Sequence, residues 1–164
     1  MSDGHLYKAK RTDNGEWLKG NLVSTISGAR FILPSDSEVY IPKGKNTIYS
    51  TEFYRVGPST ICWCTGRKDK NGTLIWENDI TKLVLSDGEV RYFKVSFKKV
   101  IRKVLCHPDF DDDVAKVELN AICFEWNGYE LFPCIDENGV SDVSKMEVVG
   151  NIFDNPGLLE AQNE

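Results

Sequence analysis

The sequence predicts a mainly β fold, a barrel or sandwich of short antiparallel strands. Turn sequences with Asn-Gly or Asp-Gly recur along the 164 residues, and each separates stretches rich in β-branched and aromatic residues. They lie at 13–15, 71–72, 87–88, 127–128 and 138–139. Asparagine and glycine tolerate the positive φ that tight turns require, so each is a hairpin signal. Many short strands joined by such turns are typical of β barrels and sandwiches.

The clearest hairpin is expected at residues 65–80, TGRKDKNGTLIWENDI. Its polar turn, 69–72, is followed by the short apolar run 74–76 and then by an acidic step into the run 80–85. Strands are also expected on both sides of the first turn and, at 117–126 and 129–135, on both sides of the fourth.

One or two short helices interrupt this pattern. The irregular stretch 24–57 contains Ser35-Asp36-Ser37-Glu38, whose serine and downstream carboxylate resemble a capping box, so we expect one helical turn there. In the stretch 90–105, alternation indicates a strand up to Phe97. Apolar residues then recur at i, i+3, i+4, i+7 and i+8, which predicts a short helix that ends before Pro108. The aspartates at 109–113 are expected in an acidic turn or the first turn of a further helix.

Composition indicates one soluble globular domain, residues 1–164. The hydrophobic content is 41% and the charged content 27%, and no apolar run approaches the ~18 residues that cross a bilayer. The first five residues are polar, and they lack the apolar stretch of a secretion signal. We therefore expect a cytoplasmic location and no membrane association.

Five cysteines in such a chain are expected to be mostly buried, reduced thiols. A zinc site would use Cys62 and Cys64 with Cys106 and His107. Structural zinc sites prefer two to four residues between paired ligands, and a single residue separates Cys62 from Cys64. Burial as apolar side chains is therefore the favoured interpretation, and no metal is predicted.

The main charge asymmetry is a run of six bases without an acid between residues 91 and 103. They are Arg91, Lys94, Lys98, Lys99, Arg102 and Lys103. On the helical interpretation the last four lie opposite the apolar stripe. They could contact the phosphates of a nucleic acid or nucleotide, or an acidic partner. The alternative is a solvated face that pairs with the following aspartates, and the net charge of −5 favours it.

No catalytic motif is present, so no catalytic residue and no cofactor are predicted. Nucleophile elbows, phosphate-binding loops and His-Glu-x-x-His are all missing. Glu77 and Asp79 would share a face of one strand and could hold a metal or act as an acid/base pair, but a polar hairpin edge is the simpler interpretation. Four tryptophans could form an aromatic binding platform, although in β domains they are more often core residues. They are Trp17, Trp63, Trp76 and Trp126.

Three segments are similar to the YopX family of phage and prophage proteins. They are LYKAKRTDNGEWLKGNLV at 6–23, the hairpin segment 65–80, and EVVGNIFDNPGLLE at 147–160. The middle segment matches the family pattern of Thr-Gly, Lys-Asp-x-Asn-Gly and an aromatic residue before an acidic turn. Asn78 replaces the usual glycine, and we expect the turn to survive because asparagine also adopts positive φ. Arg67 occupies a commonly apolar position, and residues 86–146 match poorly.

The resemblance implies a mostly β fold with a small barrel or roll like that of Src-homology-3 domains, and an accessory gene of a bacteriophage. It supplies no catalytic or binding residues. One hypothesis is a non-catalytic, oligomeric interaction module that binds a host or phage protein in the cytoplasm of the infected bacterium. The other is a nucleic-acid or nucleotide-binding protein that uses the basic stretch 91–103.

Overall fold

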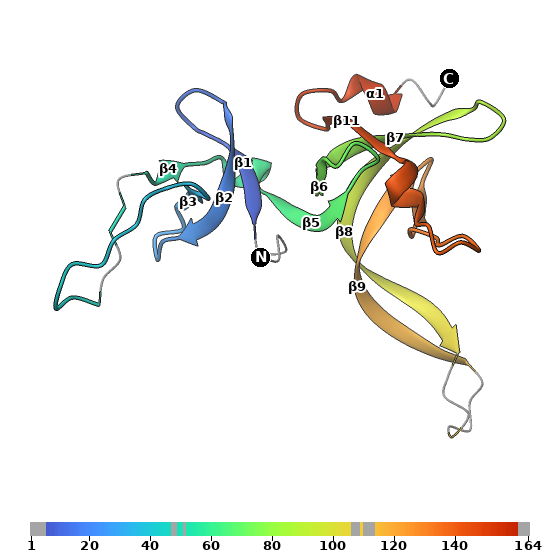
Figure 1. Cartoon of the computed structure of the whole chain (residues 1–164), viewed down its shortest axis with the longest axis horizontal. Coiled ribbons are helices and arrows are strands. Elements are labelled where there is room, and N and C mark those ends of the chain that lie inside the picture. The colour runs from blue at the N-terminus through green and yellow to red at the C-terminus, as the bar shows by residue number, and fades with distance from the viewer. Residues whose placement is uncertain (1–5, 47–48, 51, 106–108, 110–113, 161–164) are drawn as a thin grey trace. The chain divides into compact units, whose positions relative to one another are not determined.

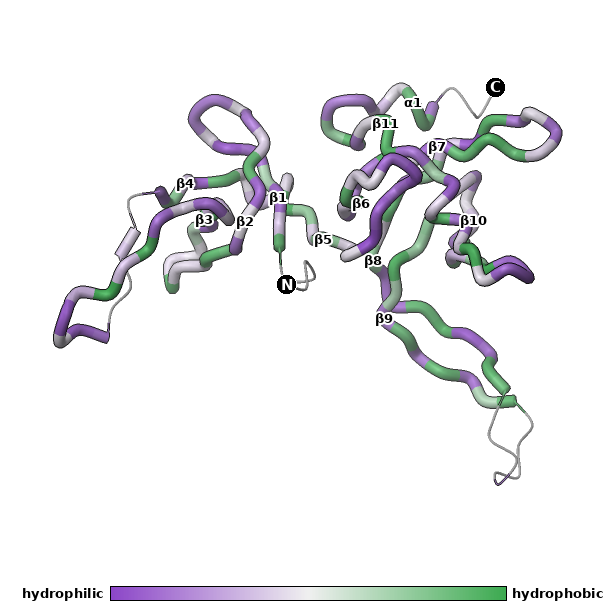
Figure 2. The backbone as a smooth tube through the Cα atoms, in the orientation of Figure 1, coloured by the Kyte–Doolittle hydropathy of each residue, from purple (hydrophilic) through white to green (hydrophobic). Residues whose placement is uncertain are grey.

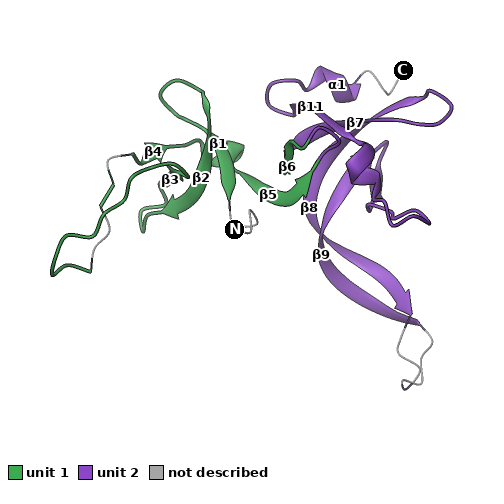
Figure 3. Cartoon of the chain, viewed as in Figure 1, with its two compact units in different colours: residues 1–68, 72–77 green, residues 69–71, 78–164 purple. Residues whose placement is uncertain are grey.

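The computed structural model describes residues 6–46, 49–50, 52–105, 109 and 114–160, and these form two antiparallel β-sheets (Figure 1). The chain divides into two compact units, coloured separately in Figure 3. Unit 1 comprises residues 1–68 and 72–77, and unit 2 comprises residues 69–71 and 78–164. The single-domain prediction stays a prediction, because this division does not say whether the units fold separately.

Unit 1 contains a six-stranded sheet in the order β4-β3-β2-β1-β5-β6. The strands are β1 (Tyr7–Lys10), β2 (Trp17–Ser24), β3 (Arg30–Pro34), β4 (Tyr54–Arg55), β5 (Cys62–Lys68) and β6 (Leu74–Trp76), with the 3-10 helix η2 at Pro58–Thr60. Its core is formed by Ala9, Ile32 and Val56, against which Tyr7 and Leu18 pack.

Unit 2 contains a five-stranded sheet in the order β10-β9-β8-β7-β11. The strands are β7 (Asp79–Val84), β8 (Val90–Leu105), β9 (Val114–Trp126), β10 (Tyr129–Leu131) and β11 (Glu147–Asn151). The short helices are η3 (Asp142–Lys145) and α1 (Gly157–Glu160). Phe93 and Phe124 meet edge to face in the core, with ring centroids 6.5 Å apart.

The mainly β prediction is confirmed, but the predicted barrel is wrong. Each strand order is a line with two ends, so neither sheet closes. A barrel requires the first and last strands to pair along a staggered register. The end strands β4, β6 and β10 have only two or three residues, which leaves little backbone for such a closure.

The five predicted turns are confirmed, and the glycine of each has a positive φ between 74° and 88°. The β9–β10 loop is the tight two-residue form, because Asn127 (φ 47°) also adopts the left-handed region. The hairpin at 71–72 is more open: β5 and β6 pair with an irregular register between Cys64 and Lys68. The expectation for Asn78 is confirmed by its φ of 65°.

Both helix predictions based on spacing are wrong. Residues 97–105 continue β8 and pair residue by residue with 114–122 of β9. The apolar positions therefore divide between two sheet faces, Phe97, Ile101 and Leu105 on one and Val100 and Val104 on the other. The strand is favoured over the helix because β9 provides a partner for the whole segment and because the segment is rich in β-branched residues. Residues 35–36 form a turn, in which the Ser37 amide donates to the Pro34 carbonyl over 3.1 Å.

The segment 65–80 is joined to the C-terminal segment within unit 2. The Asp69 carboxylate, only 6% exposed, accepts hydrogen bonds from the amides of Asn71 (2.8 Å) and Val148 (2.9 Å). Lys70 pairs with Glu147 at 2.7 Å. The carbonyl of Asn78 accepts from the Ile152 amide at 3.0 Å. These contacts give the polar residues of the segment a structural role, since they connect two of the three family-like segments.

Candidate interaction surface on the β8–β9 arm

The stretch with the predicted basic residues belongs to a long two-stranded arm. β7 pairs with β8 only up to Lys94, and β10 pairs with β9 only from Phe124 onward. The pairing of β8 with β9 continues to Leu105 and Val114. We define the arm as residues 96–105 and 114–123. Figure 1 shows these two strands running on together past the rest of their sheet.

The strand conformation places the six bases on two faces of the sheet. Side chains alternate along a strand, so Arg91, Lys99 and Lys103 lie on one face, and Lys94, Lys98 and Arg102 on the other. The single basic patch expected from a helix is therefore not formed.

Three of the lysines pair with glutamates of neighbouring strands. Lys98 contacts Glu125 (3.2 Å) and Glu130 (3.1 Å), Lys94 lies 3.6 Å from Glu125, and Lys99 lies 2.8 Å from Glu118. The hydrogen bond to Glu130 raises the pKa of Lys98. Burial opposes ionisation of Glu125, but the hydrogen bonds from Ser96 and Lys98 and the charges of Lys94 and Lys98 outweigh it, so the pKa of Glu125 lies below its usual value. These acids come from β9 and β10.

The two arginines contact aromatic rings. Arg91 binds both carboxylate oxygens of Glu89 at 2.8 and 3.1 Å and lies 4.4 Å from the ring centroid of Trp126. The pKa of Arg91 is raised by the hydrogen bond with Glu89. Arg102 lies 4.3 Å from the ring centroid of Phe132. Such contacts hold a guanidinium in place and satisfy part of its charge.

The two strands of the arm still carry an excess of positive charge. Lys103 and Lys116 lie directly opposite each other across the two strands, and both are exposed. Like charges in this position are destabilising. The two strands of the arm contain five bases (Lys98, Lys99, Arg102, Lys103 and Lys116) and one acid (Glu118), whereas the segment 106–113 that joins them in the sequence contains four aspartates.

Apolar side chains are also exposed along the arm. Ile101 is 64% and Leu105 85% exposed. The full set is Phe97, Ile101, Val104, Leu105, Val114 and Leu119. Figure 2 shows hydrophobic residues alternating with hydrophilic ones along both strands. Single exposed apolar residues are ordinary, but six on one ribbon indicate an interaction surface.

The outer edges of the arm are open as well. Within the described residues, no strand pairs with β8 beyond Lys94 or with β9 before Phe124 on their outer sides. Free strand edges offer backbone donors and acceptors to another chain.

The other predicted site residues do not form a site within the described residues. A turn with Asn78 at positive φ separates Glu77 from Asp79, so they do not share a face of one strand as predicted. The Glu77 amide donates to the Trp63 carbonyl at 2.9 Å, and the Glu77 carboxylate accepts from the Trp63 amide at 3.4 Å. Asp79 is buried in β7. The part of the chain that the structure describes contains no group of three or more metal-ligating side chains.

The cysteines and tryptophans have mainly structural surroundings. Cys62, Cys64 and Cys123 are buried, as expected, and Cys134 is exposed. Cys106, His107 and most of the acidic stretch 109–113 lie outside the described residues. Trp76 is buried, and the Lys8 ammonium lies 5.1 Å from the Trp17 ring and 5.9 Å from the Trp76 ring. With Trp76 enclosed in this way, the tryptophans do not present one common stacking platform.

Residues 6–160 match the family model described as YopX protein. The chain belongs to the YopX family. The match includes both compact units and the whole arm, so the YopX-family fold extends through the region 86–146 that resembled the family poorly at the level of motifs. No curated protein matches this chain. Within the described residues, no helix is long and apolar enough to cross a bilayer.

The sequence indicated only half of the candidate surface. The predicted site residues all lie in the basic run of β8. The residues that β9 contributes, such as Lys116 and Leu119, were not predicted as site residues. The strand predicted at 117–126 does contain Leu119, but only the register shows that it lies opposite Val100.

Proposed function

We propose that this YopX-family protein is a non-catalytic interaction module of a bacteriophage or prophage. It binds a host or phage protein in the cytoplasm of the infected bacterium, and identical copies assemble into a homo-oligomer. The observation that carries this proposal is the arm, a ribbon with open edges, exposed apolar side chains and basic strands.

The arm combines the features of a protein-binding surface. Apolar side chains such as Ile101 supply buried area on contact, and the free strand edges can extend a partner's sheet. The bases on its two strands favour a partner with an acidic surface, because complementary charge speeds the encounter and excludes unsuitable partners.

Site-specific photocrosslinking in infected cells tests this proposal. A photoreactive amino acid at Ile101 should yield a discrete adduct with one partner protein. The same group at Ile26, an exposed apolar residue in the turn between β2 and β3, serves as the matched control. Adding Val114→Glu to the Ile101 crosslinking variant should reduce the adduct at least about tenfold, because Val114 pairs with Leu105 on the face of the arm that carries Ile101, and the change places an acid there. Identical adducts from Ile26 and Ile101, or none from the arm, would refute the proposal.

Nucleic-acid or nucleotide binding is the second candidate, and the Lys103–Lys116 pair favours it. A phosphate bound between these two lysines would relieve the repulsion between their positive charges. A two-stranded ribbon of this kind also fits the major groove of DNA. Binding of single- and double-stranded DNA, titrated with salt, separates the candidates. An affinity that falls with salt and is weakened by Lys103→Gln and Lys116→Gln would establish nucleic-acid binding. The absence of binding at low salt would exclude it.

A further inference from the structure

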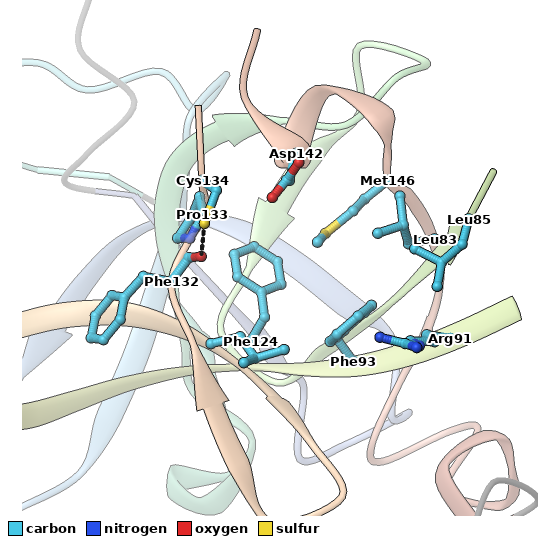
Figure 4. A pocket seen from close by; sticks show the side chains of 11 residues that line it. Leu83, Leu85, Arg91, Phe93, Phe124, Phe132, Pro133, Cys134, Asp142 and Met146 are labelled. Carbon is cyan, nitrogen blue, oxygen red and sulfur yellow. Dashed lines mark hydrogen bonds between the residues drawn. The ribbon is translucent and has the colours of Figure 1, made fainter. Parts of the chain in front are cut away.

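Unit 2 contains a cavity of about 270 Å³ that the proposed function does not use. It lies between the face formed by β7, β8 and β9 and the segment 131–146 (Figure 4). The lining is mainly apolar, with Phe93, Phe124 and Met146 among the residues that form it.

The apolar wall of this cavity is held in place before any ligand arrives. Phe93 and Phe124 are 3% and 1% exposed and pack edge to face. The Thr81 hydroxyl donates to the Met146 sulfur at 3.6 Å, which helps to hold that side chain in place. A preformed apolar wall lowers the entropic cost of binding.

Two charged residues line the cavity, and only one of them is neutralised. The Arg91 guanidinium is bound by both oxygens of Glu89 and is stacked on Trp126. Asp142, at the start of η3, uses its backbone amide to donate to the Cys134 carbonyl at 3.0 Å. Among the interactions of the described residues, none involves the Asp142 carboxylate.

The nearest base in the same helix does not compensate this charge. Lys145 pairs with Asp136 at 3.0 Å. Figure 4 shows Asp142 across the cavity from Phe93 and Phe124, with Met146 between the two sides. The cavity therefore joins a packed apolar wall to one half-buried carboxylate, for which the described part of the chain provides no partner.

We propose that this cavity binds a small organic cation with an apolar body, such as an arylalkylamine. The ammonium group contacts the Asp142 carboxylate, and the body packs on Phe93, Phe124 and Met146. The volume lies just below the ~300–1,000 Å³ of typical ligand sites, which limits the ligand to about the size of one aromatic ring with a short chain. Asp142 repels an anion of the same shape. A neutral molecule of this shape cannot form the charge-assisted hydrogen bond with the Asp142 carboxylate.

The methionine content of the chain allows a direct test. Met1 and Met146 are the only methionines, so ¹³C-methyl labelling gives two signals, of which one reports on the cavity. Phenethylamine should shift the Met146 signal saturably and leave Met1 unchanged. 2-Phenylethanol should bind at least about tenfold more weakly, and 3-phenylpropanoate should cause no shift.

Variants separate the carboxylate from the apolar wall. Asp142→Asn should weaken phenethylamine binding about tenfold and leave 2-phenylethanol binding unchanged, whereas Asp87→Asn, an exposed acid in the β7–β8 turn, should alter neither. Equal affinities of the wild-type protein for the amine and the alcohol would overturn the proposal, as would a Met146 signal that no compound moves. The wild-type comparison stands even if Asp142→Asn does not fold.

Discussion

Replacing Asp69 with alanine should destabilise the protein by removing a buried acceptor of two hydrogen bonds. The buried carboxylate accepts one hydrogen bond from the Asn71 amide in its own turn and another from the Val148 amide, 79 residues away. Alanine removes both acceptors and leaves the Val148 amide in a half-buried position without this partner. The loss therefore affects both the hairpin turn and its attachment to β11.

The magnitude follows from these two bonds. A hydrogen bond to a charged group contributes about 1.5–3 kcal/mol, and the exposed Asn71 amide regains part of its share from water. We expect a loss of about 3 kcal/mol in the free energy of unfolding, which corresponds to about 6–12 °C in Tm for a chain of this length. Asp69→Asn should recover only part of it, because its amide group cannot accept from the second N–H.

Urea unfolding followed by tryptophan fluorescence measures this change, and hydrogen exchange of the Val148 amide locates it. Asp87→Ala is the matched control, because its exposed carboxylate accepts a single local bond from the Glu89 amide at 2.9 Å. That variant should lose only about 0.5 kcal/mol. If Asp69→Ala and Asp87→Ala shift the unfolding midpoint equally, or if Val148 keeps its protection, the role given to Asp69 is wrong.

Two further predictions concern packing and charge. Gly20→Ala should cost about 3 kcal/mol or more, because an added Cβ would lie 2.0 Å from the Leu33 carbonyl oxygen of the adjacent strand. Gly57→Ala, where the nearest atom is at an ordinary 3.5 Å, should cost under about 1 kcal/mol in the same thermal unfolding assay. The lowered pKa of Glu125 means that it stabilises the fold above its unfolded pKa of about 4.3, and that this contribution is lost as the pH falls through the lower folded pKa. Glu125→Gln should therefore be less stable than the wild-type protein at pH 7. The difference should be about 1 kcal/mol or less, because this carboxylate is 26% exposed, and it should vanish in acid. A difference in stability that stays constant from pH 7 to pH 3 would contradict this prediction.

Part of the candidate site was predictable from the sequence, and the reason is visible in β8. The six bases between residues 91 and 103 identified the right strand. Their grouping depended on whether the backbone was helical, and apolar spacing could not decide this. The i, i+4 relation of Phe97 and Ile101 is compatible with one helix face and equally with one strand face. The pairing of 97–105 with 114–122 decided in favour of the strand.

The sequence by itself determined where this chain turns and the family to which it belongs. Gly15, Gly88 and Gly128 turn the chain at the predicted positions because the need for positive φ is a local property of the backbone. The tertiary structure alone decided that the sheets stay open, that Asp69 is bound to Val148, and that an arm and a cavity exist. Each of these depends on which distant strand supplies the partner for a backbone or side-chain group. That choice is made by packing and register across the chain, and no local pattern contains it.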